Sequence, residues 1–105
     1  MAVPDFTDRA LSDLLSLADR RALVTGAGRG IGRAIADRFA EAGADLVLAG
    51  LDGDELRAAA DGIAARHGVR CRAVPVDLAQ PDAARACMAA AIAEAGRIDI
   101  LVNNA

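Results

Sequence analysis

Short apolar runs alternate with helically spaced apolar positions along most of this chain of 105 residues. Four runs predict strands, at residues 21–25, 45–49, 70–77 and 98–102, and the first of them has the pattern of a buried strand. Between these runs, apolar side chains recur every three or four residues, which is the spacing of one helix face. The pattern therefore predicts the order β-α-β-α-β-α-β. Connections of this kind cross over between strands, so the sheet should be parallel.

Each of the three predicted helices has one apolar face and ends at a glycine. The first ends at Gly43 and the second covers residues 53–68, whereas the third has Pro81 in its first turn and ends at Gly96. The side chains expected to face the sheet are Ile31, Ile35, Phe39 and Ala42, then Leu56, Ala59, Ala60, Ile63 and Ala64, and then Ala84, Cys87, Met88, Ala91 and Ile92. Pro75 favours an edge position for the third strand.

A further helical pattern precedes the first strand. Its apolar residues are Leu11, Leu14, Leu15 and Ala18. The spacing predicts a short helix within residues 7–18. We therefore expect an N-terminal helical arm over residues 1–19, followed by one domain over residues 20–105.

The composition excludes several classes of protein. A chain that is 54% hydrophobic and 26% charged is typical of a folded globular protein. Its net charge of -3 gives no reason to expect nucleic acid or an anionic membrane as a partner. There is neither an apolar run of about 18 residues nor the pattern of a secretory signal, so we expect a cytoplasmic protein without a membrane span. Cys71 and Cys87 lack metal-ligand spacing, and we expect no metal site.

Four glycines lie in the stretch TGAGRGIG, residues 25–32, between the first strand and the first helix. Glycines at such a turn let the backbone approach a ligand closely, and the N-terminus of the following helix attracts phosphate. The chain has no lysine, which excludes a Walker loop, and the spacing does not fit G-x-G-x-x-G. The spacing that fits is T-G-x-x-x-G-x-G, formed by Thr25, Gly26, Gly30 and Gly32. The alternative is a connecting turn without a ligand.

Two further stretches extend this motif into a family resemblance. VDL at residues 76–78 follows the third strand, and ILVNNA at residues 100–105 includes the fourth. Together with the glycine stretch they resemble the short-chain dehydrogenase/reductase family, over about residues 17–105. The resemblance implies an α/β Rossmann-type, doubly wound parallel sheet with strand order 3-2-1-4. This sheet would be incomplete, because the family continues to a fifth strand, and the fourth strand would be an exposed edge.

The same resemblance implies a dinucleotide cofactor at the glycine stretch. Its pyrophosphate and adenosine ribose would lie among Gly26, Arg29, Gly30, Ile31 and Gly32. Arg29 has an alternative interpretation as a solvated surface charge.

The stretches after the third and fourth strands would complete the cofactor site. The resemblance implies that Asp77 accepts a hydrogen bond from the adenine amine, with Leu78 beside the ring. Asn103 and Asn104, followed by Ala105, would lie near the ribose on the nicotinamide side and fix the loop. Alternatively, Asp77 only ends a strand and caps a turn, and the two asparagines only hold the turn after the fourth strand.

The choice between NAD and NADP depends on the end of the second strand. In the family, an acid there favours NAD and a basic residue one position later favours NADP, but this chain has Gly50 and Leu51 at these positions. Asp52 lies about 20 residues after Gly32, the general spacing of a ribose-binding acid, and it could instead belong to the loop or cap the next helix. Arg29 could reach a 2′-phosphate, and Leu51 and Asp52 are further candidate cofactor-binding residues. The balance leans to NADP over NAD.

The residues that perform the family's chemistry are absent from this chain. The resemblance implies a serine and a Tyr-x-x-x-Lys pair, but the chain has no tyrosine, no lysine and no serine after Ser16. We assign no catalytic residue, and we interpret the chain as the cofactor-binding part of an oxidoreductase. The family resemblance implies hydride transfer between NAD(P)H and a small carbonyl or alcohol substrate, in a homo-oligomer. The alternatives are a stand-alone dinucleotide-binding module and a non-functional remnant.

Overall fold

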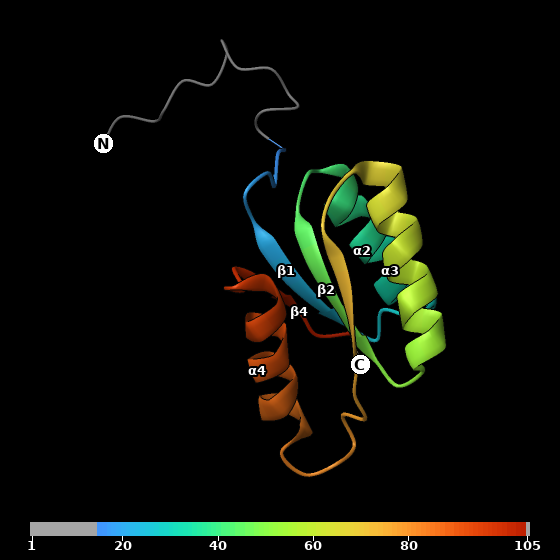
Figure 1. Cartoon of the computed structure of the whole chain (residues 1–105), viewed down its shortest axis with the longest axis vertical. Helices are drawn as coiled ribbons and strands as arrows, with labels where there is room; N and C mark the ends of the chain where they lie inside the picture. The colour runs from blue at the N-terminus through green and yellow to red at the C-terminus, as the bar shows by residue number, and fades with distance from the viewer. Residues whose placement is uncertain (1–14, 105) are drawn as a thin grey trace, which may run out of the picture.

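The structure is a computed structural model that describes residues 15–104. These residues form a four-stranded parallel sheet with helices on both faces (Figure 1). The strands are β1 (Arg21–Thr25), β2 (Asp45–Gly50), β3 (Cys71–Pro75) and β4 (Ile100–Val102). Their order, β3-β2-β1-β4, confirms the predicted doubly wound topology. Pro75 lies in the edge strand β3, as its missing N–H requires.

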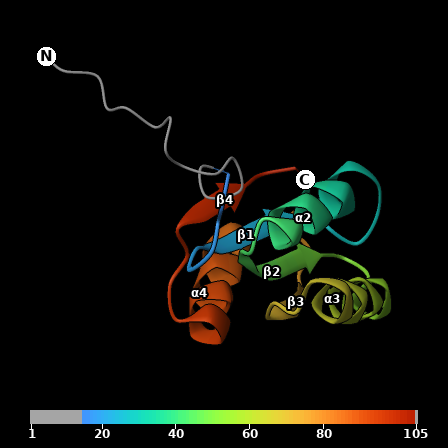
Figure 2. The same ribbon diagram turned by 90° about the horizontal axis from the view of Figure 1, so that it is seen from above.

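Three helices cover the two faces of the sheet (Figure 2). Helices α2 (Gly30–Glu41) and α3 (Gly53–His67) lie on one face, and α4 (Ala83–Ala95) lies on the other. Each helix is followed by a glycine with positive φ, a conformation that glycine adopts at little cost, at Gly43, Gly68 and Gly96. The predicted order of strands and helices is therefore confirmed.

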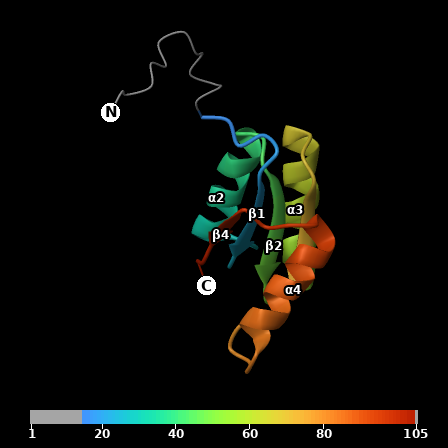
Figure 3. The same ribbon diagram turned by 90° about the vertical axis from the view of Figure 1, so that its left-hand side faces the viewer.

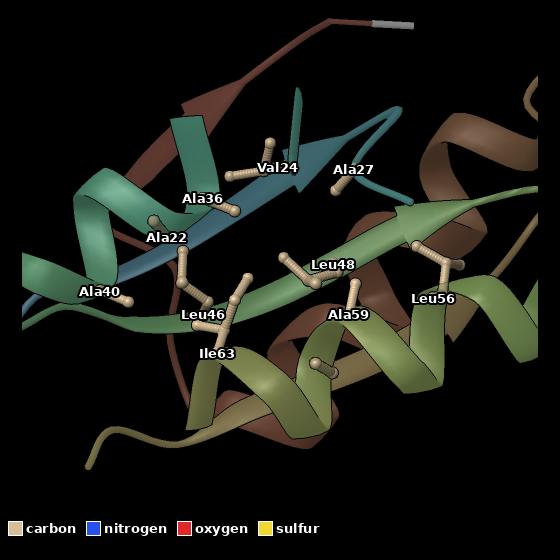
Figure 4. Packing of buried hydrophobic residues seen from close by; sticks show 11 residues of the cluster. Ala22, Val24, Ala27, Ala36, Ala40, Leu46, Leu48, Leu56, Ala59 and Ile63 are labelled. Atoms are coloured by element: carbon tan, nitrogen blue, oxygen red, sulfur yellow. The ribbon is translucent and has the colours of Figure 1, made fainter. Parts of the chain in front are cut away.

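The core beneath α2 and α3 is built from side chains that alternate along the two central strands (Figure 4). Ala22 and Val24 of β1 and Leu46 and Leu48 of β2 point to this face, as residues two apart do in a strand. Ile63 of α3 packs among them and is fully buried. This layer fixes α3 against β2 and so sets the position of the segment that joins them.

Helix α2 approaches the sheet closely because its buried face is made of small residues. Gly32, Ala36 and Ala40 are buried at a spacing of four residues, and Phe39 is half-buried beside them. The prediction that Ile31 faces the sheet is wrong, because 72% of this residue is exposed. The sequence pattern gave weight to large apolar side chains, whereas tight packing of a helix on a sheet selects small ones.

The buried face of α4 also differs from the prediction. Its buried residues are Ala83, Cys87 and Ala91, which are spaced by four. Ala84 and Ile92 were expected to face the sheet, and this is wrong because both are exposed. An alanine-rich helix differs little in hydrophobicity between its faces, so the pattern does not fix its rotation about its own axis.

Two predicted features outside the regular elements need correction. Pro81 lies two residues before the first residue of α4 rather than in its first turn, because Asp82 is the N-cap residue. Residues 15–18 are not helical, and the rest of the predicted arm lies outside the described residues. The Leu17 N–H donates to the Ala42 carbonyl at 2.8 Å, which attaches this segment to the end of α2.

Strand β4 occupies the other edge of the sheet. Within residues 15–104 its one strand neighbour is β1, as expected for an edge strand. Leu101 in this strand is 53% exposed. The edge therefore presents both unpaired backbone groups and an apolar side chain.

A cluster of charged side chains joins α2 to the end of α3. Asp37 Oδ1 accepts a hydrogen bond from Arg66 Nη2 at 2.8 Å and lies 3.0 Å from His67 Nε2. The Arg66 hydrogen bond, followed by the contact with His67, holds the pKa of the Asp37 carboxyl below its ordinary value of 3.8. The folded protein therefore favours the ionised carboxylate.

We expect Asp37→Asn to lower the free energy of unfolding by less than about 1 kcal/mol at pH 7, because the cluster is partly exposed to solvent. The folded-state pKa of Asp37 is below the unfolded-state value. Its contribution is therefore fully present above the unfolded-state pKa and is lost as the pH falls through the folded-state pKa. Urea unfolding should separate the two proteins at pH 7, and the difference should disappear as the pH falls through the folded-state pKa. A difference that persists at low pH contradicts this assignment.

Candidate functional site

The segments that follow the four strands meet at the carboxyl ends of the strands, along one end of the sheet. Thr25 of β1 pairs with Ala49 of β2, and Ala49 pairs with Val74 of β3, so the carboxyl ends of these strands lie level. On the other side of β1, Figure 3 shows the end of β4 beside the start of α2. Ligands of doubly wound sheets bind outside this end, which makes it the candidate site.

A cleft of about 320 Å³ lies at this end, between the glycine stretch and the start of α3. Its walls are Gly26, Gly28, Arg29, Gly50, Leu51, Asp52, Glu55 and Leu56. Four of the residues predicted from the sequence, Gly26, Arg29, Leu51 and Asp52, therefore line one cleft.

A second cleft, of about 280 Å³, adjoins the first. The two share Gly26, Gly50 and Leu51, and the second is completed by Val76, Asp77, Leu78 and Ala79. Leu51 is 74% exposed and stands where the two clefts meet. The structure therefore brings Asp77 and Leu78 next to the glycine stretch, although they are about 50 residues away in the sequence.

The required glycines of the stretch have different physical roles. Gly26 and Gly30 have φ values of 60° and 63°, the left-handed region in which a side chain is strained. Gly32 has no such φ, but a Cβ there would lie 2.1 Å from the Gly26 carbonyl oxygen. Two of these glycines thus permit the turn, and the third permits α2 to begin directly against it.

Thr25 and the two asparagines hold the glycine turn to the end of β4. The Asn104 N–H donates to Thr25 Oγ1 at 2.9 Å, and Thr25 is 5% exposed. Asn104 Nδ2 lies 3.4 Å from the Gly26 carbonyl oxygen, and Asn103 Oδ1 lies 3.3 Å from Thr25 Oγ1. The contacts agree with the interpretation that both asparagines fix this loop.

The two helices that begin at the first cleft have opposite kinds of N-terminus. Asp52 caps α3, since its Oδ1 accepts from the N–H groups of Asp54 and Glu55, each at 3.1 Å. At α2 the N-cap residue Arg29 makes no such side-chain hydrogen bond, and the first turn contains no acid. The start of α2 is therefore the end that can accept an anion, while that of α3 is already satisfied by its own carboxylate.

Asp77 also serves as a local cap. Its Oδ1 accepts from the Ala79 N–H at 3.0 Å, and its Oδ2 accepts from Gln80 Nε2 at 3.3 Å. This is the turn-capping role that the sequence left as an alternative. The carboxylate nevertheless lines the second cleft, so the cap also fixes its position there.

Glu55 is a cleft residue that the sequence analysis missed. Its Oε1 lies 3.7 Å from Arg29 Nε, and a Cβ on Gly28 would meet the same oxygen at 2.7 Å. The spacing Asp52-x-x-Glu55 is a known helix-capping pattern, which assigns Glu55 to α3 alone. Its contact with the glycine stretch joins residues far apart in the sequence, and no local pattern predicts that.

Several predicted residues lie beside the clefts rather than in their walls. Gly30, Ile31 and Gly32 form the first turn of α2. Asn104 contacts Gly26, and Asn103 contacts Thr25. Ala105 lies outside the described residues.

Two other hollows lie away from the carboxyl ends of the strands. One of about 30 Å³ lies at the amino ends of the strands and is too small for a nucleotide. Another lies along β3 and includes Cys71, whose burial raises the pKa of its thiol to about 12 and leaves it protonated at neutral pH. Among residues 15–104, no three His, Cys, Asp or Glu side chains form a group that could hold a metal ion. None of the helices in residues 15–104 combines the length and the hydrophobicity of a membrane span.

Comparison with known proteins agrees with this geometry. A relative from Mycobacterium tuberculosis, described as an uncharacterized oxidoreductase, is 44% identical over 92 residues, which are 88% of this chain and 35% of that protein. A 3-oxoacyl (acyl-carrier-protein) reductase from Agrobacterium tumefaciens, solved with NADP bound, matches with a TM-score of 0.85 and 38% identity. That match covers 95% of this chain and 38% of the other.

A second solved relative is L-sorbose reductase from Gluconobacter frateurii, complexed with NADPH and L-sorbose. It matches with a TM-score of 0.81 and 40% identity, covering 87% of this chain and 35% of the other. The chain thus spans about a third of the length of the curated relatives it matches. The family model for short chain dehydrogenase matches residues 20–105. The chain therefore belongs to the short-chain dehydrogenase family.

Proposed function

We propose that this chain binds NADP(H) or NAD(H) at the two adjoining clefts, as the cofactor-binding part of an oxidoreductase. The observation that carries the proposal is the close approach of α2 to the glycine turn, where Gly32 leaves room for no side chain. This arrangement supports a phosphate group at a helix start whose first turn contains no acid and whose N-cap side chain makes no capping hydrogen bond.

The two clefts would hold the ribose and the adenine of the cofactor's adenosine. The pyrophosphate would lie at the start of α2, beside Gly26, Gly30 and Gly32. The ribose would enter the first cleft between Arg29 and Leu51, and the adenine would enter the second, against Asp77 and Leu78. Asn103 and Asn104, with Ala105 after them, would support the ribose on the nicotinamide side by holding the loop.

The choice between the two cofactors rests mainly on Arg29. Its side chain is 87% exposed at the rim of the first cleft, where its guanidinium could pair with a 2′-phosphate. Asp52 could accept a hydrogen bond from a ribose 2′-hydroxyl, but its Oδ1 is already shared between two helix N–H groups. Solved relatives bound to NADPH or NADP add support. We therefore favour NADP over NAD.

The bound cofactor would supply or accept the hydride. The residues of this chain would bind it, orient it and hold the loops around it, and none of them has a role in proton transfer. We propose a small carbonyl or alcohol as the substrate of the complete enzyme, and a cytoplasmic homo-oligomer as its form. A second candidate is a binding module without catalysis, which the two clefts would serve equally well.

Titration with NADPH and NADH, followed by the quenching of their fluorescence, tests the proposal. We expect saturable binding of NADPH by the protein expressed at the full length of its gene. Arg29→Gln should weaken the binding of NADPH about tenfold more than that of NADH, because a charge-assisted hydrogen bond to the 2′-phosphate is lost.

Arg33→Gln is the matched control for this titration, since Arg33 is an exposed residue of α2 that lines neither cleft. It should leave the ratio of the two affinities unchanged. Absence of binding at millimolar cofactor would contradict the proposal. Turnover of a carbonyl or alcohol by the same protein separates the oxidoreductase from the module.

A further inference from the structure

Glu55 lines the first cleft with a carboxylate that no local structure requires. Within residues 15–104 this carboxylate accepts no hydrogen bond, and its one ion-pair partner is Arg29, at 3.7 Å. The side chain is 34% exposed. Asp52, by contrast, caps α3 and shares its charge with two N–H groups.

The Glu55 carboxylate also lies against the glycine stretch. A Cβ at position 28 would lie 2.7 Å from Glu55 Oε1, so the carboxylate occupies the space that Gly28 leaves open. Gly28 is the one glycine of the stretch that the T-G-x-x-x-G-x-G spacing does not require. Because Gly28 has no side chain, the Glu55 carboxylate can lie at this position.

The balance of charge in the cleft follows from these contacts. Its charged wall residues are one cation, Arg29, and two acids, Asp52 and Glu55. A 2′-phosphate carries close to two negative charges at neutral pH and gains from Arg29, but the two carboxylates of the same wall repel it. A ribose with a free 2′-hydroxyl meets no such repulsion.

We infer that Glu55 is a specificity-determining residue that lowers the affinity of the first cleft for a 2′-phosphorylated ribose. It does so by pairing with Arg29 and by adding a negative charge beside the position of the phosphate. The inference rests on the proposed function, since it assumes that the ribose lies in this cleft. Glu55 therefore makes the preference for NADP over NAD smaller than it would be if Arg29 were the one charged residue beside the ribose.

Calorimetric titration with 2′-phospho-ADP-ribose and with ADP-ribose tests the inference. These probes differ only in the phosphate and need no catalytic residue. In the protein expressed at the full length of its gene, Glu55→Gln should raise the ratio of the two affinities, in favour of the phosphorylated probe, by about three- to tenfold. Asp54→Asn is the matched control, because Asp54 belongs to the same helical turn but its side chain is fully exposed and pairs with Arg57.

The possible outcomes separate the inference from the proposed function. The control should change the ratio by less than about twofold, since the field of an exposed charge is screened. An unchanged ratio in Glu55→Gln, or an equal change in both variants, overturns the inference and leaves the proposed function intact. Failure of the unsubstituted protein to bind either probe contradicts the proposed function and removes the inference with it.

Discussion

Gly32→Ala should abolish the binding of NADPH and lower the free energy of unfolding by about 3 kcal/mol. The added Cβ would lie 2.1 Å from the Gly26 carbonyl oxygen and 2.8 Å from Asn104 Nδ2. The first of these atoms belongs to the backbone of a tight turn and cannot rotate away. Either the turn or the start of α2 must move, and both form the proposed phosphate site.

Gly62→Ala is the matched control for this substitution. Gly62 also lies in a helix, but a Cβ there would have its nearest contact 3.6 Å away, at Arg66 Nη1. Alanine favours the helix over glycine, so this variant should be up to about 1 kcal/mol more stable and should bind NADPH normally. Urea unfolding and fluorescence titration measure both quantities. Normal cofactor affinity in Gly32→Ala would refute the placement of the pyrophosphate.

Ile63→Ala should lower the free energy of unfolding by roughly 2–5 kcal/mol. Ile63 is fully buried between α3 and the sheet, where Leu46 and Leu48 also pack. Truncation removes apolar contacts and leaves a cavity that the surrounding strands cannot fill by a small shift. The loss is a large part of the total stability of a domain of this size.

Ile92→Ala removes the same atoms from a helix position that is 44% exposed. This variant should lose less than about 1 kcal/mol, because little apolar surface is taken from a core and alanine favours the helix. Urea denaturation of the two variants measures the comparison directly. Equal losses would mean that α3 does not cover the sheet as described.

The strands and the glycine turn could be predicted from the sequence because their causes are local. An apolar run bounded by polar residues is sufficient to place β1, whose bounds are as predicted. The spacing of Gly26, Gly30 and Gly32 likewise reports backbone requirements of a single turn. The strand order came from the family resemblance, because no local feature encodes which strands become neighbours.

The faces of the helices were less predictable. Side-chain size favoured Ile31 and Ile92 as core residues, and both are exposed. The buried positions of α2 and α4 are instead alanine and other small residues, whose hydrophobicity hardly distinguishes one face from another. Which small residues are buried depends on how closely each helix approaches the sheet, and this is a property of the assembled fold.

The candidate site was predictable where a residue and its hydrogen-bond partners lie in the same segment. Asp52 and Asp77 were correctly recognised as residues that could cap local structure, and the structure contains both caps. Glu55 was missed because its partner, Arg29, lies on another segment. Contacts of this kind require the positions of both segments, which the sequence alone did not provide.

The two capping carboxylates also affect the entropy of binding. Asp52 and Asp77 accept hydrogen bonds from N–H groups of their own segments, so the chain itself orders the loops after β2 and β3. A ligand that enters there would not have to supply the free energy of ordering these loops. Discrimination between related ligands would then depend on charge and shape at a rim that is already in place.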